Sequence, residues 1–217
     1  MNNESVKKAL DEVLKEKGSK KFSQTVDLII NLKDLDLKKN DQQIDFFVEL
    51  PKGKSKENKI CGLVGPELVD EAKANLDHVI EAHDFDDLKK DPKKIKKLAE
   101  SYDFFIAQAN IMPQVATAFG KILGSRGKMP NPKAGCVVPP KAQLAPLVER
   151  LKRTVRVTAK ASPSVKVPVG TEDQATEDLF ANIQSVYNGI ASNAIQGENN
   201  IKETMIKLTM GKPVKVD

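Results

Sequence analysis

The sequence has no tryptophan and few aromatic residues or cysteines. Aromatic residues make up 5% of the 217 positions, so a binder of single-stranded nucleic acid built on a row of stacked rings is not expected. The two cysteines, Cys61 and Cys136, stand alone among aliphatic neighbours. This excludes a disulfide framework, Cys-x-x-Cys redox chemistry and a cysteine-based zinc site. We interpret both cysteines as small buried residues.

Long apolar runs are missing as well. No run approaches the roughly 18 residues that a membrane span needs. The opening residues MNNES lack the charged-then-apolar layout of a secretory signal. We therefore expect a cytoplasmic protein without a membrane partner.

Histidine is scarce, which limits metal chemistry. His78 and His83 lie in a segment expected to be a strand and its exit, whereas a zincin helix carries its histidines at positions i and i+4 with a glutamate between them. Asp84, Asp86 and Asp87 resemble the start of a calcium loop, but the central glycine and the distal glutamate are absent. We expect no metal site.

The composition that remains suits a folded, basic protein. Hydrophobic residues make up 40% and charged residues 30% of the chain, enough for real cores in one large domain or two small ones. Thirty-five Lys and Arg against 30 Asp and Glu give a formal net charge of +5, which suits a polyanionic partner. With so few rings, any RNA contact must use phosphate charge, hydroxyl groups and backbone shape.

The first part of the chain shows one helical and two strand patterns. Apolar side chains recur at helical spacing over residues 5–18 and predict an amphipathic helix that ends near Gly18. Apolar and polar residues alternate over 25–33 and over 44–50, as in half-buried strands. We interpret these strands as an antiparallel hairpin joined by a polar turn at 38–43.

The middle of the chain has a different pattern. Short apolar runs at 60–64, 78–82 and 104–107 alternate with helical patterns, which lie at 67–76, 92–102 and 113–123. Strands that are apolar on both faces and alternate with helices predict a small parallel α/β sheet. A Gly- and Pro-rich loop at 124–140 and a helix at 142–153 complete this part.

Half-buried strands return in the last part of the chain. They are expected at 155–159 and 165–169, followed by a long helix at 175–195 and a strand at 201–210. The chain therefore predicts an α+β domain made of its two ends, with an α/β domain inserted between them and a hinge at the two crossings. A single continuous sheet is the alternative that the pattern leaves open.

The glycine-rich segment Gly124–Gly135 could bind phosphate groups, because glycines expose backbone amides. It is not a P-loop, because Ile122 and Met129 stand where a Ser or Thr must follow Gly-Lys, and because it follows a helix. A polyanion-binding loop and an ordinary solvated interdomain loop are equal alternatives. Its nearby cations are Lys121, Arg126, Lys128 and Lys133.

Four motifs carry a resemblance to one family. The segment GSRGKMPNPKAG at 124–135 resembles the signature loop of the universal large-subunit ribosomal protein L-one family. KFSQTVD at 21–27 is similar to its first-strand motif, KVPVG at 166–170 to a later strand, and TMG at 209–211 to its terminal motif. Their order and spacing cover essentially the whole chain, and the short length and plain ends resemble an archaeal member.

The resemblance implies a fold and a function. The fold would be a discontinuous α+β sandwich domain at 1–58 and 155–217 with an inserted Rossmann-like α/β domain at 59–154. The function would be binding without a reaction or a cofactor: the protein would hold large-subunit ribosomal RNA in the mobile stalk and assist release of deacylated tRNA from the exit site. It would also repress translation of its own operon by binding its messenger RNA. We expect a monomer when free, and a cytoplasmic location on the large ribosomal subunit.

The expected RNA-binding residues all lie in the terminal domain, and all except Ser164 belong to the motifs above. They are Lys21, Phe22, Thr25, Asp27, Ser164, Lys166, Thr209, Met210 and Gly211. Structured RNA offers ribose hydroxyls and phosphates along a shallow groove, so the carboxylate of Asp27 could accept a ribose hydrogen bond while Lys21 and Lys166 reach phosphates. Gly211 lacks Cβ and would let the backbone approach RNA closely.

Some of these assignments have alternatives or depart from the family pattern. Phe22 could instead be a hydrophobic lid at the start of a strand. Met210 is in phase with Ile206 and Leu208, so packing in the core is an equal alternative. Asp27 stands where a longer Glu is common, and Lys212 interrupts the usual Thr-Met-Gly-Pro ending.

The inserted domain is expected to contribute only secondary RNA contacts, through Arg126, Lys128 and Lys133. The competing hypotheses are a small α/β nucleotide-binding protein or enzyme that uses the Gly124–Gly135 loop, and a protein-interaction module. The enzyme hypothesis lacks a credible nucleophile, base or metal cluster.

Overall fold

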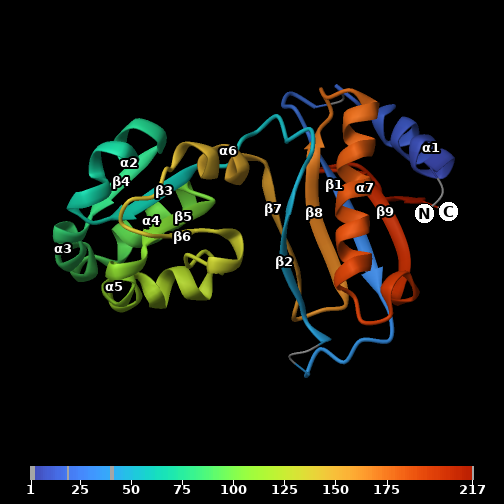
Figure 1. The fold of residues 1–217 in the computed structure, drawn as a ribbon. Coiled ribbons are helices and arrows are strands. Elements are labelled where there is room, and N and C mark those ends of the chain that lie inside the picture. Colours follow the sequence, from blue (N-terminus) through green and yellow to red (C-terminus); the bar gives the residue numbers. More distant parts are fainter. Residues whose placement is uncertain (1–2, 19, 40–41, 217) are drawn as a thin grey trace. The chain divides into compact units, whose positions relative to one another are not determined.

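The structure is a computed structural model that describes residues 3–18, 20–39 and 42–216. The chain divides into two compact units (Figure 1). We call Met1–Glu57 together with Arg153–Asp217 the terminal unit, and Asn58–Lys152 the inserted unit. Each unit is described by itself.

The terminal unit combines helices with antiparallel sheets. Its elements are α1 (Asn3–Leu14), β1 (Thr25–Leu32), β2 (Ile44–Glu49), β7 (Thr154–Ala159), β8 (Ser164–Thr171), α7 (Thr176–Asn193), η6 (Gly197–Asn200), β9 (Ile201–Leu208) and β10 (Val214–Val216). One sheet has the strand order β10-β9-β1-β8, and the other pairs β2 with β7. The helix expected at the start of the chain ends earlier than predicted, and Gly18 lies in the turn beyond it with a left-handed φ of 71°.

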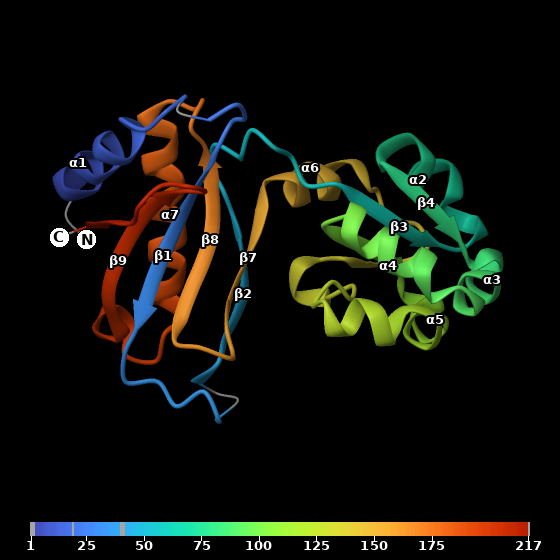
Figure 2. The same ribbon diagram turned by 180° about the vertical axis from the view of Figure 1, so that it is seen from behind.

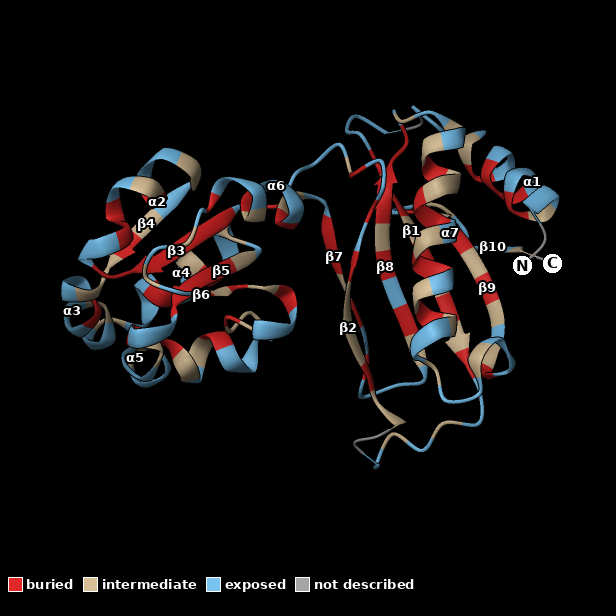
Figure 3. Cartoon of the chain, viewed as in Figure 1, coloured by how far each residue is buried: buried red, intermediate tan, exposed pale blue. Residues whose placement is uncertain are grey.

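The core of the terminal unit lies between the sheets and the helices α1 and α7. On β1, buried and half-buried residues alternate strictly, and Figure 3 shows buried bands along the strands and along one side of α7. The buried apolar side chains of β1, β8, α1 and α7 belong to one hydrophobic cluster. Figure 2 looks at the sheet from behind, and there β9, β1 and β8 lie in front of α7. The half-buried side of β1 therefore faces away from that helix.

The hairpin expected from the first two strands is wrong. β1 lies between β9 and β8, and β2 pairs with β7, with Ile44 opposite Ala159 and Glu49 opposite Thr154. Alternation identifies the buried face of each strand correctly, but it carries no information about the partner strand. The partners of β1 come from the far end of the chain. The turn expected at 38–43 includes residues 40 and 41, which lie outside the described residues.

The inserted unit contains the expected parallel sheet. Its elements are β3 (Ile60–Val64), η2 (Pro66–Leu68), α2 (Val69–Asn75), β4 (His78–Glu81), η3 (Ala82–Asp84), α3 (Phe85–Lys90), α4 (Pro92–Ser101), β5 (Phe104–Gln108), η4 (Ala109–Ile111), α5 (Met112–Ser125), η5 (Pro132–Ala134), β6 (Val137–Val138) and α6 (Ala145–Arg153). The strand order is β4-β3-β5-β6 with parallel pairings. Since the described strands form three separate sheets, a single continuous sheet is excluded.

Local sequence signals explain most of the inserted unit. All five residues of β3 are buried, as its unbroken apolar run predicts. Helix α4 begins where Asp91 Oδ1 accepts a hydrogen bond from the amide of Lys93 at 3.2 Å, with Pro92 at the first helical position. The sequence analysis missed α3 and β6, since each is too short to show a period. The last helix begins at Ala145, three residues later than expected.

Candidate nucleic-acid interface

Four of the nine expected RNA-binding residues lie on one side of the four-stranded sheet of the terminal unit. In the sheet register, Asp27 of β1 lies opposite Pro168 of β8 and Lys207 of β9. The side away from α7 is called the outer face (Figure 2). By strand alternation it carries Thr25, Asp27, Ile29, Asn31, Ser164, Lys166, Pro168, Glu203, Met205, Lys207 and Lys215.

The start of β1 and the end of β9 are joined beside Asp27. The amide of Thr209 donates to the carbonyl of Thr25 at 3.0 Å. The hydroxyl of Thr209 accepts from the amide of Thr25 at 3.1 Å and donates to its carbonyl at 3.3 Å. The expected RNA-binding hydroxyl is thus already bonded to β1, and one acceptor lone pair is left for a further contact.

A buried glutamine fixes the same end of the sheet. The side-chain amide of Gln24, which is 1% exposed, donates to Glu172 Oε2 at 3.2 Å and accepts from the amide of Met210 at 3.2 Å. The backbone carbonyl of Gln24 also accepts from the amide of Glu172 at 2.9 Å. One side chain therefore holds three chain segments together. The sequence analysis gave Gln24 no role, although it lies within the quoted motif at 21–27.

Asp27 is a half-buried acid of the outer face. Burial raises its pKa above the ordinary value of 3.8, and the positive charge of Lys207 opposes this effect. A carboxylate with incomplete hydration gains from any hydrogen-bond donor that reaches it. Ribose hydroxyls are such donors, so the position suits the role expected for Asp27.

Lys166 and Ser164 are the outer-face polar residues of β8, and they lie at increasing distance from the Asp27 carboxylate. Lys166 and Ser164 are two and four residues from Pro168, which pairs with Asp27. At roughly 3.4 Å per residue, Ser164 lies about 14 Å along the strand. Lys166 is exposed and Ser164 half-buried, while Lys21 is exposed ahead of β1. The structure therefore brings Lys166 near Asp27 and leaves Ser164 at the opposite end of the outer face.

Two apolar residues of the motifs are exposed. Phe22 is 52% and Met210 is 65% exposed, so neither is a core residue. Core packing of Met210 is wrong because β9 ends at Leu208, where the amide of Gly211 donates back to the Leu208 carbonyl at 3.0 Å. A Cβ on Gly211 would lie 3.2 Å from the Cβ of Leu208, so this glycine also lets the turn pack closely against the end of β9.

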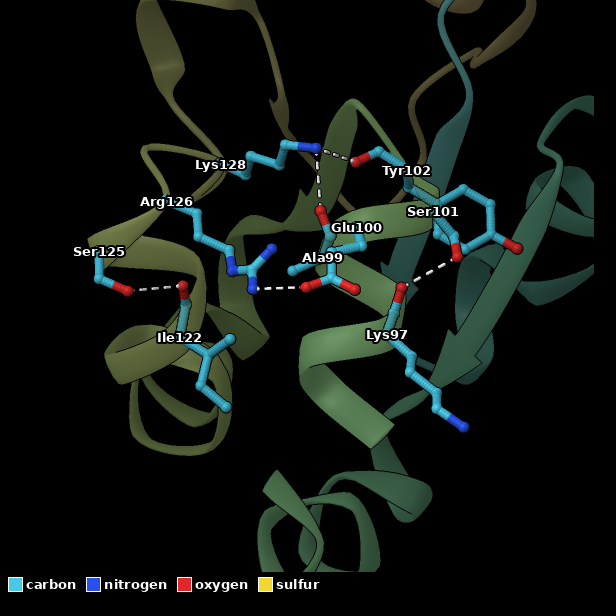
Figure 4. A network of polar contacts seen from close by, with 9 residues as sticks. All are labelled: Lys97, Ala99, Glu100, Ser101, Tyr102, Ile122, Ser125, Arg126 and Lys128. Carbon is cyan, nitrogen blue, oxygen red and sulfur yellow. Dashed lines mark hydrogen bonds and ion pairs between the residues drawn. The ribbon is translucent and has the colours of Figure 1, made fainter. Parts of the chain in front are cut away.

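Two cations of the glycine-rich segment, Arg126 and Lys128, have partners inside the inserted unit (Figure 4). Arg126 Nη2 lies 2.7 Å from Glu100 Oε1. Lys128 Nζ donates to the carbonyls of Ala99 and Tyr102 at 2.9 and 2.7 Å, where it satisfies acceptors at the C-terminus of α4. The secondary RNA contacts expected of Arg126 and Lys128 would have to break or share these bonds.

The rest of the signature segment is folded by its own contacts. Asn131 Oδ1 accepts from the amide of Lys133 at 2.9 Å and caps η5, while the Lys133 side chain is exposed. Gly135 has a left-handed φ of 76°, and a Cβ there would lie 2.6 Å from Arg150 Nη2. Gly127, with a φ of 65°, and Gly135 therefore stand where the backbone of this unit requires a left-handed conformation.

The sequence analysis missed the β9 and β10 side of the outer face. Asn31 Nδ2 donates to Glu203 Oε1 at 2.6 Å, and Lys215 Nζ lies 3.0 Å from Glu203 Oε2. The hydrogen bond from Asn31 has the larger effect and the contact with Lys215 the smaller one, and together they lower the pKa of Glu203. Lys207 and Met205 lie on the same face and are half-buried. Alternation over the strand expected at 201–210 indicates Glu203, Met205 and Lys207 as outward positions, whereas Lys215 lies on the short strand β10, which has no such signal.

Other expected features can be located in the described part of the chain. Across residues 3–18, 20–39 and 42–216, no helix has the length and apolar character to cross a membrane, and no three His, Cys, Asp or Glu side chains form a group that could hold a metal ion. Cys61 and Cys136 are buried, as expected. Burial raises the pKa of the Cys61 thiol to about 12 and that of Cys136 to about 11, so both stay protonated at neutral pH.

Comparison with known proteins gives a consistent result over nearly the whole chain. Residues 13–212 match the ribosomal protein L1p/L10e family. The chain is 43% identical over 197 residues to the large ribosomal subunit protein uL1 of Thermococcus kodakarensis, covering 90% of this chain and 89% of that protein. Identity to the protein of the same name is 42% over 214 residues in Methanobrevibacter smithii, with 98% and 99% covered. In Methanothermococcus thermolithotrophicus it is 39% over 217 residues, with both chains covered completely.

Proposed function

The chain belongs to the ribosomal protein L1p/L10e family, and from this membership we propose that it binds large-subunit ribosomal RNA through the outer face of its terminal unit. The relatives are archaeal large ribosomal subunit proteins. Proteins of that kind are structural components of the cytoplasmic ribosome and are not enzymes.

The observation that carries the proposal is the composition of the outer face next to the joined ends of β1 and β9. An acid with incomplete hydration, Asp27, lies within one strand spacing of Lys207 and near the exposed Lys166. Acceptors combined with lysines match the ribose hydroxyls and phosphates of a shallow RNA groove. The exposed Phe22 and Met210 add apolar surface at the same end.

The division of labour between the units is part of the proposal. The terminal unit is the discontinuous RNA-binding domain, and the inserted unit is the Rossmann-like domain that makes secondary contacts. The chain acts in the mobile stalk, assists release of deacylated tRNA from the exit site, and represses its own operon by binding a messenger that presents a similar fold. One outer face serves both RNAs in turn, and the free protein is a monomer.

A footprint on large-subunit ribosomal RNA tests the proposal directly. The full chain should protect one compact structured element, and the protected element should compete with the protein's own messenger for binding. Lack of site-specific protection, or protection that persists when the outer face is altered by Asp27→Ala and Lys166→Ala together, would overturn the assignment.

A thermal-unfolding assay with added ligands separates the competing hypotheses. Stabilisation against heat by folded RNA is expected, whereas stabilisation by nucleotides alone through the Gly124–Gly135 loop would favour the nucleotide-binding alternative. The internal contacts of Arg126 and Lys128 weigh against that alternative, because both cations already serve the fold.

A further inference from the structure

The inserted unit has a groove beside β4, the edge strand at the other end of the sheet from β6. The groove lies between the edge strand β4 and the helices α3 and α4, and its volume is about 590 Å³, within the usual range of small-ligand sites. Its lining is Val79, Ile80, Leu88 and Leu98 with His78 and Tyr102, and with Asp84, Asp87, Lys94, Lys97 and Ser101. Neither the expected RNA face nor the glycine-rich segment contributes to it.

Two parallel rings lie along the wall of the groove. The ring centroids of His78 and Tyr102 are 5.6 Å apart with an interplanar angle of 9°. Tyr102 is held by an edge contact with Phe105, with centroids 6.4 Å apart, while His78 is exposed. A stack of this kind next to an apolar floor is a platform for one further planar ring, such as a nucleobase.

One rim of the groove is rich in lysine. Residues 89–97, KKDPKKIKK, hold six lysines and one aspartate, and all six lysines are exposed. Lys94 and Lys97 are one turn apart on α4, on the face that also brings Leu98 to the groove. Figure 4 shows the Lys97 side chain extending away from the contacts of Arg126 and Lys128.

Few of these lysines are neutralised. Lys90 Nζ lies 2.8 Å from Asp87 Oδ1, and Lys94 Nζ lies 3.9 Å from Asp91 Oδ2. In the part of the chain that the structure describes, no ion pair involves the other four lysines of the segment. The rim therefore keeps positive charge available for a phosphate group.

Two acids also line the groove, and the pKa of Asp87 is lowered chiefly by its hydrogen bond with Lys90 and, to a smaller extent, by the nearby Lys94. Asp84 and Asp87 line the groove from η3 and α3, and ionised carboxylates accept hydrogen bonds only. Ribose hydroxyls can donate to them. The groove therefore brings together lysines, carboxylates, two stacked rings and apolar side chains. These groups match the three parts of a nucleotide, which are phosphate, sugar and base.

We propose that this groove binds one nucleoside monophosphate unit, with its base against His78 and Tyr102 and its phosphate on Lys94 and Lys97. The unit is either a free mononucleotide or an unpaired nucleotide of RNA. The site is separate from the outer face of the terminal unit and does not depend on the function assigned to that face.

Ring resonances provide a specific readout. The chain has two histidines and two tyrosines, and Tyr187 is buried in the other unit at 7% exposure, so NMR can follow the rings of His78 and Tyr102 in the full chain. The probes are adenosine monophosphate, adenosine, a single-stranded hexa-adenylate and an RNA duplex. Saturable shifts of both rings are expected with adenosine monophosphate or hexa-adenylate. The response to one probe alone identifies the free nucleotide or RNA as the source of the ligand.

Charge variants test the phosphate contact. Replacing Lys94 and Lys97 by Ala together should weaken binding of the responding probe and reduce the slope of its log affinity against log salt by about 0.7 per lysine for a single strand. Adenosine should bind more weakly than its monophosphate, and His78→Ala should weaken binding severalfold. Lys141→Ala, an exposed lysine outside the groove, should change nothing.

Three results would overturn the proposal. They are absence of saturable ring shifts with both adenosine monophosphate and hexa-adenylate, equal effects of the double variant and Lys141→Ala, and duplex RNA that competes as well as the single strand. None of these bears on the outer face, which is tested by its own variants on the same RNA-binding assay.

Discussion

The hydroxyl of Thr209 accepts a hydrogen bond from the backbone amide of Thr25 at 3.1 Å, across 184 positions of sequence. The same hydroxyl donates to the carbonyl of Thr25 at 3.3 Å. A residue expected to contact RNA therefore also links the start of β1 to the end of β9. Substitutions at Thr209 change the stability of the sheet end as well as the RNA surface, and the two effects can be separated.

Thr209→Val should lower both stability and RNA affinity. The variant leaves the amide of Thr25 without its side-chain partner, so the free energy of unfolding should fall by about 0.5–1.5 kcal/mol in urea titrations. Affinity for a ribosomal RNA fragment should fall by more than about 1 kcal/mol if the remaining lone pair meets RNA. Thr209→Ser keeps the hydroxyl and serves as the control. Unchanged values of both quantities in Thr209→Val would contradict the assignment.

Asp27→Asn should make the free protein more stable at neutral pH while weakening RNA binding. The folded-state pKa of Asp27 lies above its ordinary value of 3.8, chiefly because of burial. The folded protein therefore binds more protons than the unfolded chain between these two pKa values, and stability falls as pH rises through that window. The cost is fully present above the folded-state pKa and disappears below 3.8.

Urea unfolding of Asp27→Asn and the parent protein at neutral and at acidic pH measures this difference. The variant should gain stability only at the higher pH, and its RNA affinity should fall because a charged acceptor makes the stronger hydrogen bond. A variant less stable than the parent at neutral pH would show that attraction to Lys207 outweighs the burial of Asp27.

Lys166→Ala should act on RNA binding without affecting the fold. The side chain is exposed on β8, so one lost phosphate contact should reduce the slope of log affinity against log salt by roughly one unit. Lys8→Ala, which removes an exposed lysine from α1, is the matched control. Equal slopes for the two variants would remove Lys166 from the interface.

Lys128→Met should destabilise the inserted unit. Its ammonium group bonds the carbonyls of Ala99 and Tyr102, so its loss should lower the free energy of unfolding by about 1–3 kcal/mol. Arg126→Met is the comparison, because its ion pair with Glu100 is largely exposed and should contribute about 0–1 kcal/mol. Hydrogen exchange in α4 measures both effects. Equal protection in the two variants would contradict the capping role of Lys128.

Sequence patterns predicted the elements well and one strand pairing badly. The unbroken apolar run of β3 and the alternation of β1 each carry their own burial signal, since burial is a property of the single strand. The partner of β2 is β7, more than a hundred residues away, and no local pattern records such a distance. The short α3 and β6 were missed because a period needs several repeats.

The outer face was predictable where outward strand positions coincide with motif residues. Thr25 and Asp27 were assigned to one face by alternation, and the structure places them there. The role of Gln24 could not be predicted, because its partners Glu172 and Met210 are distant in sequence. The bonds that occupy Arg126 and Lys128 were missed for the same reason. A cluster of cations in sequence does not show which of them are already neutralised.

The way in which one unit is carried within the other has a practical consequence. The last residue of β2, Glu49, pairs with the first residue of β7, Thr154. Just beyond this pair, the amide of Leu50 donates to the carbonyl of Arg153 at 3.0 Å. The chain therefore leaves the terminal unit and re-enters it at neighbouring positions. A tight turn that joins β2 directly to β7 would make the terminal unit one continuous chain. The inserted unit, once removed, would have its two ends close together and could be inserted into another protein or circularised.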